Sequence, residues 1–327
     1  MKQASVLFLI LFLLVSCAPV QTSQLLPTLT ATLVVSTSPS KNLASPEAST
    51  KMVTQVAPTL TTTPVICDPY AAEYCITDGH FIFQRPIQPP DNISVDVTYR
   101  YASTANGTRD PHHGVEFLNR FGTPVYAAAD GLVIFAGPDR KAIYSPWTNY
   151  YGNVVVIQHA DEMFTLYAHL SKVVIETGKS VSAGDEIGEV GQTGVAIGSH
   201  LHFEVRRGKV EDYFSTQNPE LWLIPNQDES GHPFGALQIS ALNHDGKLTK
   251  RAEFTLQHFD DQNRPSSNII YGVTYSADML KGDENAGIGD LPAGKYRMVL
   301  QYNGQRFERW VQVESGRLTQ VVVVLSQ

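Results

Sequence analysis

The sequence predicts a mainly β protein with two folded parts, on three observations. Between residues 112 and 207, short runs rich in β-branched and aromatic residues alternate with glycine turns. From residue 232 onward, segments that alternate apolar and polar residues recur with turn residues between them. Prolines and turns crowd residues 67–111, so this lead-in segment is expected to pack on the first part without a core of its own. Residues 181–190 are expected to form a hairpin, and residues 218–222 a short helix.

The first 16 residues are predicted to be a signal peptide of the lipoprotein type. An apolar run at residues 6–15 follows Lys2 and is too short to span a bilayer. A small residue precedes Cys17, which resembles the bacterial lipoprotein box and implies cleavage before Cys17 and lipid attachment to its thiol. Two or more acyl chains would anchor the protein to the outer face of the cell membrane. The alternative is an ordinary secretory signal with a chance cysteine.

Residues 17–66 are predicted to be a disordered tether. They are crowded with Ser, Thr, Pro, Ala and Val, contain no aromatic residue and keep no strand or helix period. A flexible segment of this length spans roughly 35–40 Å. The tether would therefore let an anchored domain search the space beside the membrane.

Composition and cysteine count fit an exported protein. The net charge is −8 and the sequence has no basic stripe, so nucleic acid is excluded as a partner. With Cys17 assigned to the lipid, Cys67 and Cys75 remain as an even pair. A disulfide that closes this short loop is expected and would contribute about 2–3 kcal/mol.

Two clusters of histidine and carboxylate residues carry the chemistry. His200 and His202 frame a single leucine, and alternate residues of a strand point to the same face. Upstream, His112 and Glu116 are also an even number apart, so they too are expected to share a strand face. Two imidazoles and a carboxylate with an open fourth position describe a catalytic zinc site. The alternative is a set of ordinary hydrogen-bonded polar residues.

An ordered series of motifs from residue 112 to residue 206 resembles the lysostaphin and LytM type of zinc endopeptidases. The segments that carry the resemblance are HHGVE (112–116), GTPVYAAADG (122–131), YGNVVVIQH (151–159), TLYAHL (165–170), GKSVSAGDEIG (178–188), GQTG (191–194) and HLHFE (200–204). The resemblance implies a compact antiparallel β metallopeptidase domain over residues 112–226, with zinc bound in a groove. It also implies hydrolysis of peptide bonds in peptidoglycan.

The same resemblance implies that His112, Glu116 and His202 are the zinc ligands. The sequence departs from the family at Glu116, where the family has aspartate. Glutamate binds zinc at the same distance as aspartate, so Glu116 is expected to coordinate. The alternative is a surface glutamate and a lost metal site. His113 is expected to face away from the metal.

Two further histidines of the family correspond to His169 and His200. The resemblance implies that one of them takes a proton and the other donates to the oxyanion, in either order. His159 also matches a family position, and a structural hydrogen bond is its expected role.

Residues 232–327 are expected to form a separate β-sandwich domain. Residues 290–296 resemble a turn of carboxypeptidase-regulatory or prealbumin-like sandwiches. The histidines of this part are scattered and form no catalytic cluster. A binding or spacer role is therefore expected.

The expected function is hydrolysis of peptide bonds in peptidoglycan stem peptides or cross-bridges by a zinc endopeptidase anchored to the membrane. The expected partners are peptidoglycan peptides and the membrane. Two alternatives remain open. The first is a family member without catalysis that regulates other wall hydrolases, a hypothesis supported only by Glu116. The second is a wall-binding lipoprotein in which residues 232–327 carry the biological role.

Overall fold

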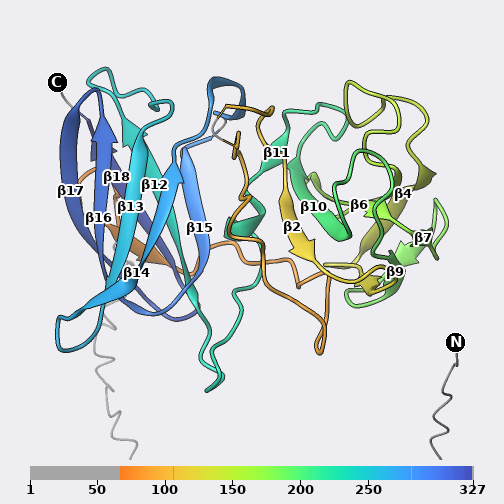
Figure 1. Cartoon of the computed structure of the whole chain (residues 1–327), viewed down its shortest axis with the longest axis horizontal. Coiled ribbons are helices and arrows are strands. Elements are labelled where there is room, and N and C mark those ends of the chain that lie inside the picture. Colours follow the sequence, from red (N-terminus) through yellow and green to blue (C-terminus); the bar gives the residue numbers. More distant parts are fainter. Residues whose placement is uncertain (1–66, 106, 281, 326–327) are drawn as a thin grey trace, which may run out of the picture. The chain divides into compact units, whose positions relative to one another are not determined.

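Strands form nearly all of the regular structure of this protein (Figure 1). The computed structural model describes residues 67–105, 107–280 and 282–325, so the predicted signal peptide, Cys17 and the tether lie outside the described residues. Within the described part, η1 (Pro219–Leu221) and η2 (Ala277–Met279) are short 3-10 turns. No helix in this part is long and apolar enough to cross a membrane. The predicted mainly β fold class is confirmed.

A seven-stranded antiparallel sheet forms the centre of the first part. Six strands follow the order β11-β10-β6-β5-β4-β8, and β2 pairs with β10. The runs of β-branched and aromatic residues become β5 and β6, and β6 is buried along its whole length. The strands are β2 (Val115–Leu118), β4 (Gly131–Pro138), β5 (Asn153–Gln158), β6 (Met163–Leu170), β8 (Ser180–Val181), β10 (His200–Arg207) and β11 (Thr216–Gln217).

A small three-stranded sheet has the strand order β3-β9-β7 and is formed by β3 (Pro124–Tyr126), β9 (Glu186–Glu189) and β7 (Lys172–Val173). The predicted hairpin over residues 181–190 is wrong. Its first strand, β8, pairs with β4, whereas its second strand, β9, pairs with β3 and β7. The local sequence pattern predicts the two strands, but it does not predict which strands they pair with.

Two four-stranded sheets form the C-terminal part and share one apolar core. The first has the order β1-β18-β12-β15, in which β12 and β18 are parallel. The second has the order β14-β13-β16-β17 and is antiparallel. The strands are β1 (Cys75–Thr77), β12 (Gly235–Leu242), β13 (Glu253–Phe259), β14 (Pro265–Val273), β15 (Ala286–Leu291), β16 (Gly294–Tyr302), β17 (Gln305–Val313) and β18 (Leu318–Val324). The division of the chain into two domains stays a prediction.

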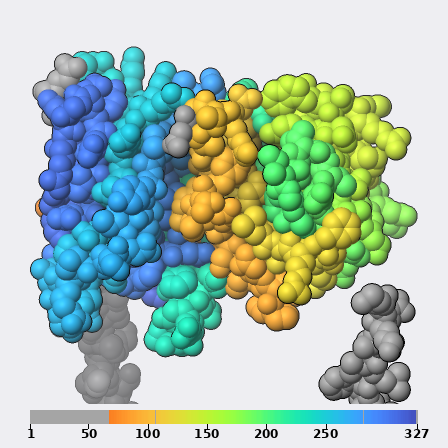
Figure 2. Space-filling model, in the orientation of Figure 1, coloured from red at the N-terminus to blue at the C-terminus, as the bar shows by residue number. Residues whose placement is uncertain are grey.

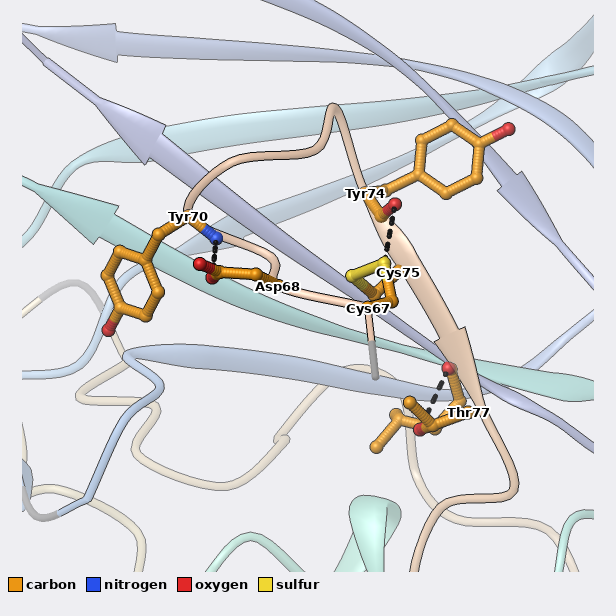
Figure 3. Close-up of a disulfide and its surroundings, with 7 residues drawn as sticks. Cys67, Asp68, Tyr70, Tyr74, Cys75 and Thr77 are labelled. Carbon is orange, nitrogen blue, oxygen red and sulfur yellow. Dashed lines mark hydrogen bonds between the residues drawn. A yellow bond between two sulfur atoms is a disulfide. The ribbon is translucent and has the colours of Figure 1, made fainter. Parts of the chain in front are cut away.

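The lead-in segment contacts both parts, whereas the sequence predicted contact with the first part only. Its β1 adds an edge strand to β18 of the C-terminal sheet. Farther along, Phe83 and Ile87 are buried in the core of the first part. The structure joins Cys67 and Cys75, whose Cα atoms lie 5.7 Å apart, in a loop that leads directly into β1 (Figure 3).

Candidate metal centre

Strands β2 and β10 lie side by side and bring the predicted ligands together (Figure 1). In their register, Glu116 on β2 lies directly opposite His202 on β10. His112 Nε2 lies 2.9 Å from Glu116 Oε1 and 3.2 Å from His202 Nδ1. His202 Nδ1 lies 3.1 Å from Glu116 Oε1. All three side chains are buried, so the predicted set forms one enclosed cluster.

His112 reaches the cluster from outside the strand, contrary to the prediction that it shares a strand face with Glu116. β2 begins only at Val115. Hydrogen bonds to the backbone of the lead-in segment position His112 instead. The His112 N–H donates to Ser103 O at 2.9 Å, and the His112 carbonyl oxygen accepts from Ala102 N–H at 2.7 Å. Gly114 allows this close approach, because a Cβ atom there would lie 2.4 Å from the Phe203 carbonyl oxygen and 3.0 Å from the His202 ring.

Hydrogen bonds at the outer nitrogens fix the orientation of both imidazoles. His112 Nδ1 donates to the Tyr99 carbonyl oxygen at 3.0 Å, and the Tyr99 ring stacks on the His112 ring at 4.1 Å between centroids. His202 Nε2 lies 3.0 Å from Glu204 Oε1. The inner nitrogens, Nε2 of His112 and Nδ1 of His202, therefore face Glu116. Such outer contacts are typical of metal-binding histidines.

The donor set fits a divalent transition metal. Ligands at 2.0–2.1 Å from one tetrahedral ion are separated by about 3.3–3.4 Å. The three inner atoms are 2.9–3.2 Å apart, so they are already close to this arrangement. The extra methylene of Glu116 does not prevent its Oε1 from reaching the two imidazoles. Two imidazole nitrogens and one carboxylate oxygen are a set that zinc prefers.

Charges around His202 decide its protonation before a metal binds. Burial lowers the pKa of His202, but the carboxylates of Glu116 and Glu204 outweigh it and raise this pKa to about 9. For Glu116, burial raises the pKa, yet the neighbouring histidines, His202 first, hold it well below its ordinary value. The metal-free cluster is therefore an imidazolium between two carboxylates.

Metal binding is expected to release about one proton per chain at pH 7.5. His202 holds a proton on Nδ1 below pH 9, and a ligating imidazole must lose it. Glu116 is already ionised and releases none. The apparent metal affinity should therefore rise about tenfold per pH unit from pH 6 up to pH 9. Calorimetry of zinc binding in two buffers with different ionisation enthalpies measures this proton, and zero release would contradict the assignment of His202 as a ligand.

His169 and His200 lie beside the three predicted ligands. The His169 ring centroid is 5.0 Å from that of His200 and 5.6 Å from that of His202. His169 Nδ1 donates to the Thr193 carbonyl oxygen at 2.9 Å, and His200 Nδ1 donates to the Gly198 carbonyl oxygen at 3.1 Å. Burial, with the adjacent His202, lowers the pKa of His169 to about 3. All five predicted site residues therefore meet in one place.

Two other histidines lie where the sequence analysis expected them, away from the cluster. His159 uses both ring nitrogens in hydrogen bonds, to Asp130 O and to Thr165 Oγ1, each at 2.8 Å. His113 stacks on Tyr213, with ring centroids 3.7 Å apart. His113 Nδ1 lies 3.4 Å from Thr216 Oγ1, and neither histidine belongs to the close set of His112, Glu116 and His202.

A buried ion pair behind His202 was missed in the sequence analysis. Glu204 and Arg206 are fully buried, and Arg206 Nε donates to Glu204 Oε2 at 2.7 Å. The Tyr151 hydroxyl donates to Glu204 Oε1 at 2.7 Å. Burial raises the pKa of Glu204, but Arg206, His202 and His113 outweigh it and hold this pKa well below its ordinary value. The even spacing of His202, Glu204 and Arg206 was the signal that could have identified this network.

The comparisons with known proteins concern this part of the chain. The sequence profile of peptidase family M23 matches residues 110–213. Peptidoglycan DD-endopeptidase ShyA of Vibrio cholerae is 35% identical over 148 residues, which are 45% of this chain and 32% of the relative. DD-carboxypeptidase/endopeptidase Mpg of Neisseria meningitidis is 45% identical over 95 residues, which are 29% of this chain and 20% of the relative.

Among solved structures, the catalytic domain of the antimicrobial peptidase lysostaphin from Staphylococcus simulans is 28% identical. That match covers 45% of this chain and 89% of the lysostaphin chain, with a TM-score of 0.30. The chain spans about a third or less of the length of the curated relatives named above.

Proposed function

We propose, from the premise that residues 110–213 form a domain of peptidase family M23, that this protein is a zinc-dependent endopeptidase of peptidoglycan. Its substrates are the peptide bonds of stem peptides or cross-bridges. The observation that carries the proposal is the buried set of His112, Glu116 and His202, with His169 and His200 beside it. The names of the relatives, DD-endopeptidase and DD-carboxypeptidase/endopeptidase, support the same substrate class.

His112, Glu116 and His202 would hold the zinc ion. When bound, zinc supplies a Lewis acid that polarises a carbonyl group and acidifies water to a pKa of about 7. The outer hydrogen bonds of His112 and His202 keep their inner nitrogens facing Glu116, so the ligands would need little rearrangement.

The two remaining histidines, His169 and His200, would have different roles in proton transfer. His169 has its Nδ1 hydrogen committed to the Thr193 carbonyl oxygen, which leaves the lone pair of Nε2 free in the neutral ring. We assign His169 as the group that accepts the proton of the attacking water. Both nitrogens of His200 lie against oxygen acceptors, with Nε2 2.9 Å from Glu116 Oε2. This favours His200 as the donor to the developing oxyanion.

The direct test is incubation of the purified zinc-loaded protein with cross-linked peptidoglycan fragments, with products identified by mass spectrometry. New amino and carboxyl ends within the peptides are expected, and removal of the metal by a chelator should abolish them. A protein that binds no zinc and cuts no fragment, yet activates another wall hydrolase, would support the regulator alternative instead.

Glu116→Ala is expected to lower zinc affinity by more than about 100-fold, because one of three buried ligands is removed. Glu116→Asp keeps the carboxylate but draws it back by about one bond, 1.5 Å, so we expect a loss of about 10- to 100-fold. Competition with a zinc-binding dye measures both variants. An unchanged affinity in Glu116→Ala would show that Glu116 is not a ligand.

We also propose that the protein works outside the cytoplasm, anchored to the cell membrane through Cys17. The support is the sequence of residues 6–17 alone. Incorporation of labelled fatty acid into the wild-type chain and its loss in Cys17→Ser is the expected result. Incorporation that is equal in both would remove the anchor from the proposal.

A further inference from the structure

A cleft of about 670 Å³ lies where the lead-in segment meets the open edge of the C-terminal sheets. One wall is formed by residues 97–104 and the other by β13, β14 and β15. Figure 2 shows this orange lead-in segment beside the light-blue strands of the C-terminal part. The edge-to-face contact of Tyr101 with Tyr275, at 5.2 Å between ring centroids, joins the two walls. The cleft has the size of an ordinary ligand site.

A second cleft of about 560 Å³ continues the first along the sheet. The two share Arg251, Glu253 and Gln301, and the second extends to the hairpin at residues 302–306. Together they form one groove, which we call the edge groove. A groove of this length fits a linear polymer better than a single small molecule.

The lining of the edge groove suits a hydroxyl-rich ligand that carries negative charge. Tyr271 on β14 is 73% exposed, which is unusual for a large ring, and it lies opposite Thr255 on β13. Four cations line the groove against one carboxylate, Glu253; they are Arg100, Lys250, Arg251 and Arg306. The chain as a whole carries a net charge of −8, so this concentration of positive charge is local.

Arg251 has its charge available for a ligand. Among the described residues it has no ion-pair partner, and its side chain is exposed. By contrast, Arg306 contacts Glu308 at 3.0 Å, and Arg100 on the opposite wall pairs with the buried Glu220. An acidic polysaccharide is bound by groups of this kind: an exposed aromatic ring, neighbouring hydroxyl and amide groups, and a guanidinium without an ion-pair partner.

The edge groove and the metal centre share one segment of chain. Ser103 lines the groove, and its carbonyl accepts the N–H of His112. Tyr99, whose carbonyl accepts from His112 Nδ1, lies between the groove-lining residues Thr98 and Arg100. A polymer in the groove would therefore lie on one side of residues 97–103, with the predicted zinc ligand on the other.

We propose that the edge groove binds the glycan strand of peptidoglycan while a stem peptide of the same polymer occupies the metal centre. The inference rests on the proposed function, because it takes the polymer from that reaction. Sugar rings would stack on Tyr271, and carboxylates carried by the glycan strand itself would pair with Arg251. The C-terminal sheets would thus supply substrate binding that residues 110–213 alone lack.

The test compares the full chain with Tyr271→Ala and Arg251→Glu on two substrates. One is intact peptidoglycan, and the other is the same cross-linked peptide freed of its glycan. Both variants are expected to raise the half-saturating concentration of intact peptidoglycan about fivefold, while hydrolysis of the free peptide stays unchanged. Two control variants should behave as wild type: Arg251→Lys, which keeps the charge, and Tyr70→Ala, which removes another exposed tyrosine, on the disulfide loop (Figure 3).

Sedimentation with intact peptidoglycan in the presence of a chelator separates failure of the groove from failure of the enzyme. One outcome is that the wild-type chain cuts neither substrate but sediments with peptidoglycan, while the two variants sediment less. The proposed function would then be wrong, and the groove proposal would be supported. If the variants match wild type in sedimentation and on both substrates, the groove proposal is overturned. An equal loss on both substrates would also overturn it, since a glycan site cannot affect a peptide without glycan.

Discussion

His202→Ala is expected to lose its metal and to reduce kcat/KM by at least about 1000-fold. His202 Nδ1 lies 3.1–3.2 Å from both other predicted ligands, and its side chain is buried. Removing it leaves two ligands and an empty space where water can compete for the ion. Metal content and hydrolysis of cross-linked peptides measure the two losses.

The matched control is His244→Ala, in which an exposed histidine of the C-terminal part is removed without effect on the metal centre. One zinc per chain in His202→Ala, with activity near wild type, would contradict the ligand assignment. Loss of activity with full zinc content would instead make His202 a residue of the reaction itself.

Arg206→Ala is expected to lower the free energy of unfolding by about 3–5 kcal/mol, because it leaves the charge of Glu204 buried without its partner. Arg206 also donates to the carbonyl oxygens of Val210 at 2.7 Å and Tyr144 at 2.9 Å, and these bonds would be lost. Since Glu204 holds Nε2 of His202, metal affinity should fall as well. Urea unfolding of the metal-free and the zinc-loaded protein measures both effects.

The double variant Glu204→Gln/Arg206→Met separates charge from packing. It removes both charges while keeping similar volumes, so its loss of stability should be clearly smaller than that of Arg206→Ala. If Arg206→Ala lowered the free energy of unfolding by less than about 1 kcal/mol, Glu204 would have to be protonated or hydrated in the absence of Arg206, contrary to the lowered pKa of Glu204.

Parts of the candidate site could be predicted from sequence with good reason. His200, His202 and the overlooked Glu204 and Arg206 follow one another at even spacing on β10, and strand geometry alone places alternate residues on one face. The order of motifs added His112, Glu116 and His169 by resemblance. The structure brings all of the predicted site histidines and Glu116 into one cluster.

The errors came from contacts that are distant in the chain. The sequence spacing predicts His112 on a strand with Glu116, but hydrogen bonds to the backbone of residues 99–103 position His112 instead. The two halves of the predicted hairpin at residues 181–190 pair with different sheets. The lead-in segment was assigned to the first part, yet its β1 completes the C-terminal sheet.

The sequence by itself determined the β content, the chemistry of the predicted ligands and the spacing that puts His200 and His202 on one strand face, because these depend on residue type and local periodicity. Only the tertiary structure decided which nitrogen of each histidine faces Glu116, how the pair of Glu204 and Arg206 supports His202, and that the edge groove exists at all. These features depend on which strands lie side by side and on how burial changes the energy of a charge. Neither is encoded within any one segment of the chain.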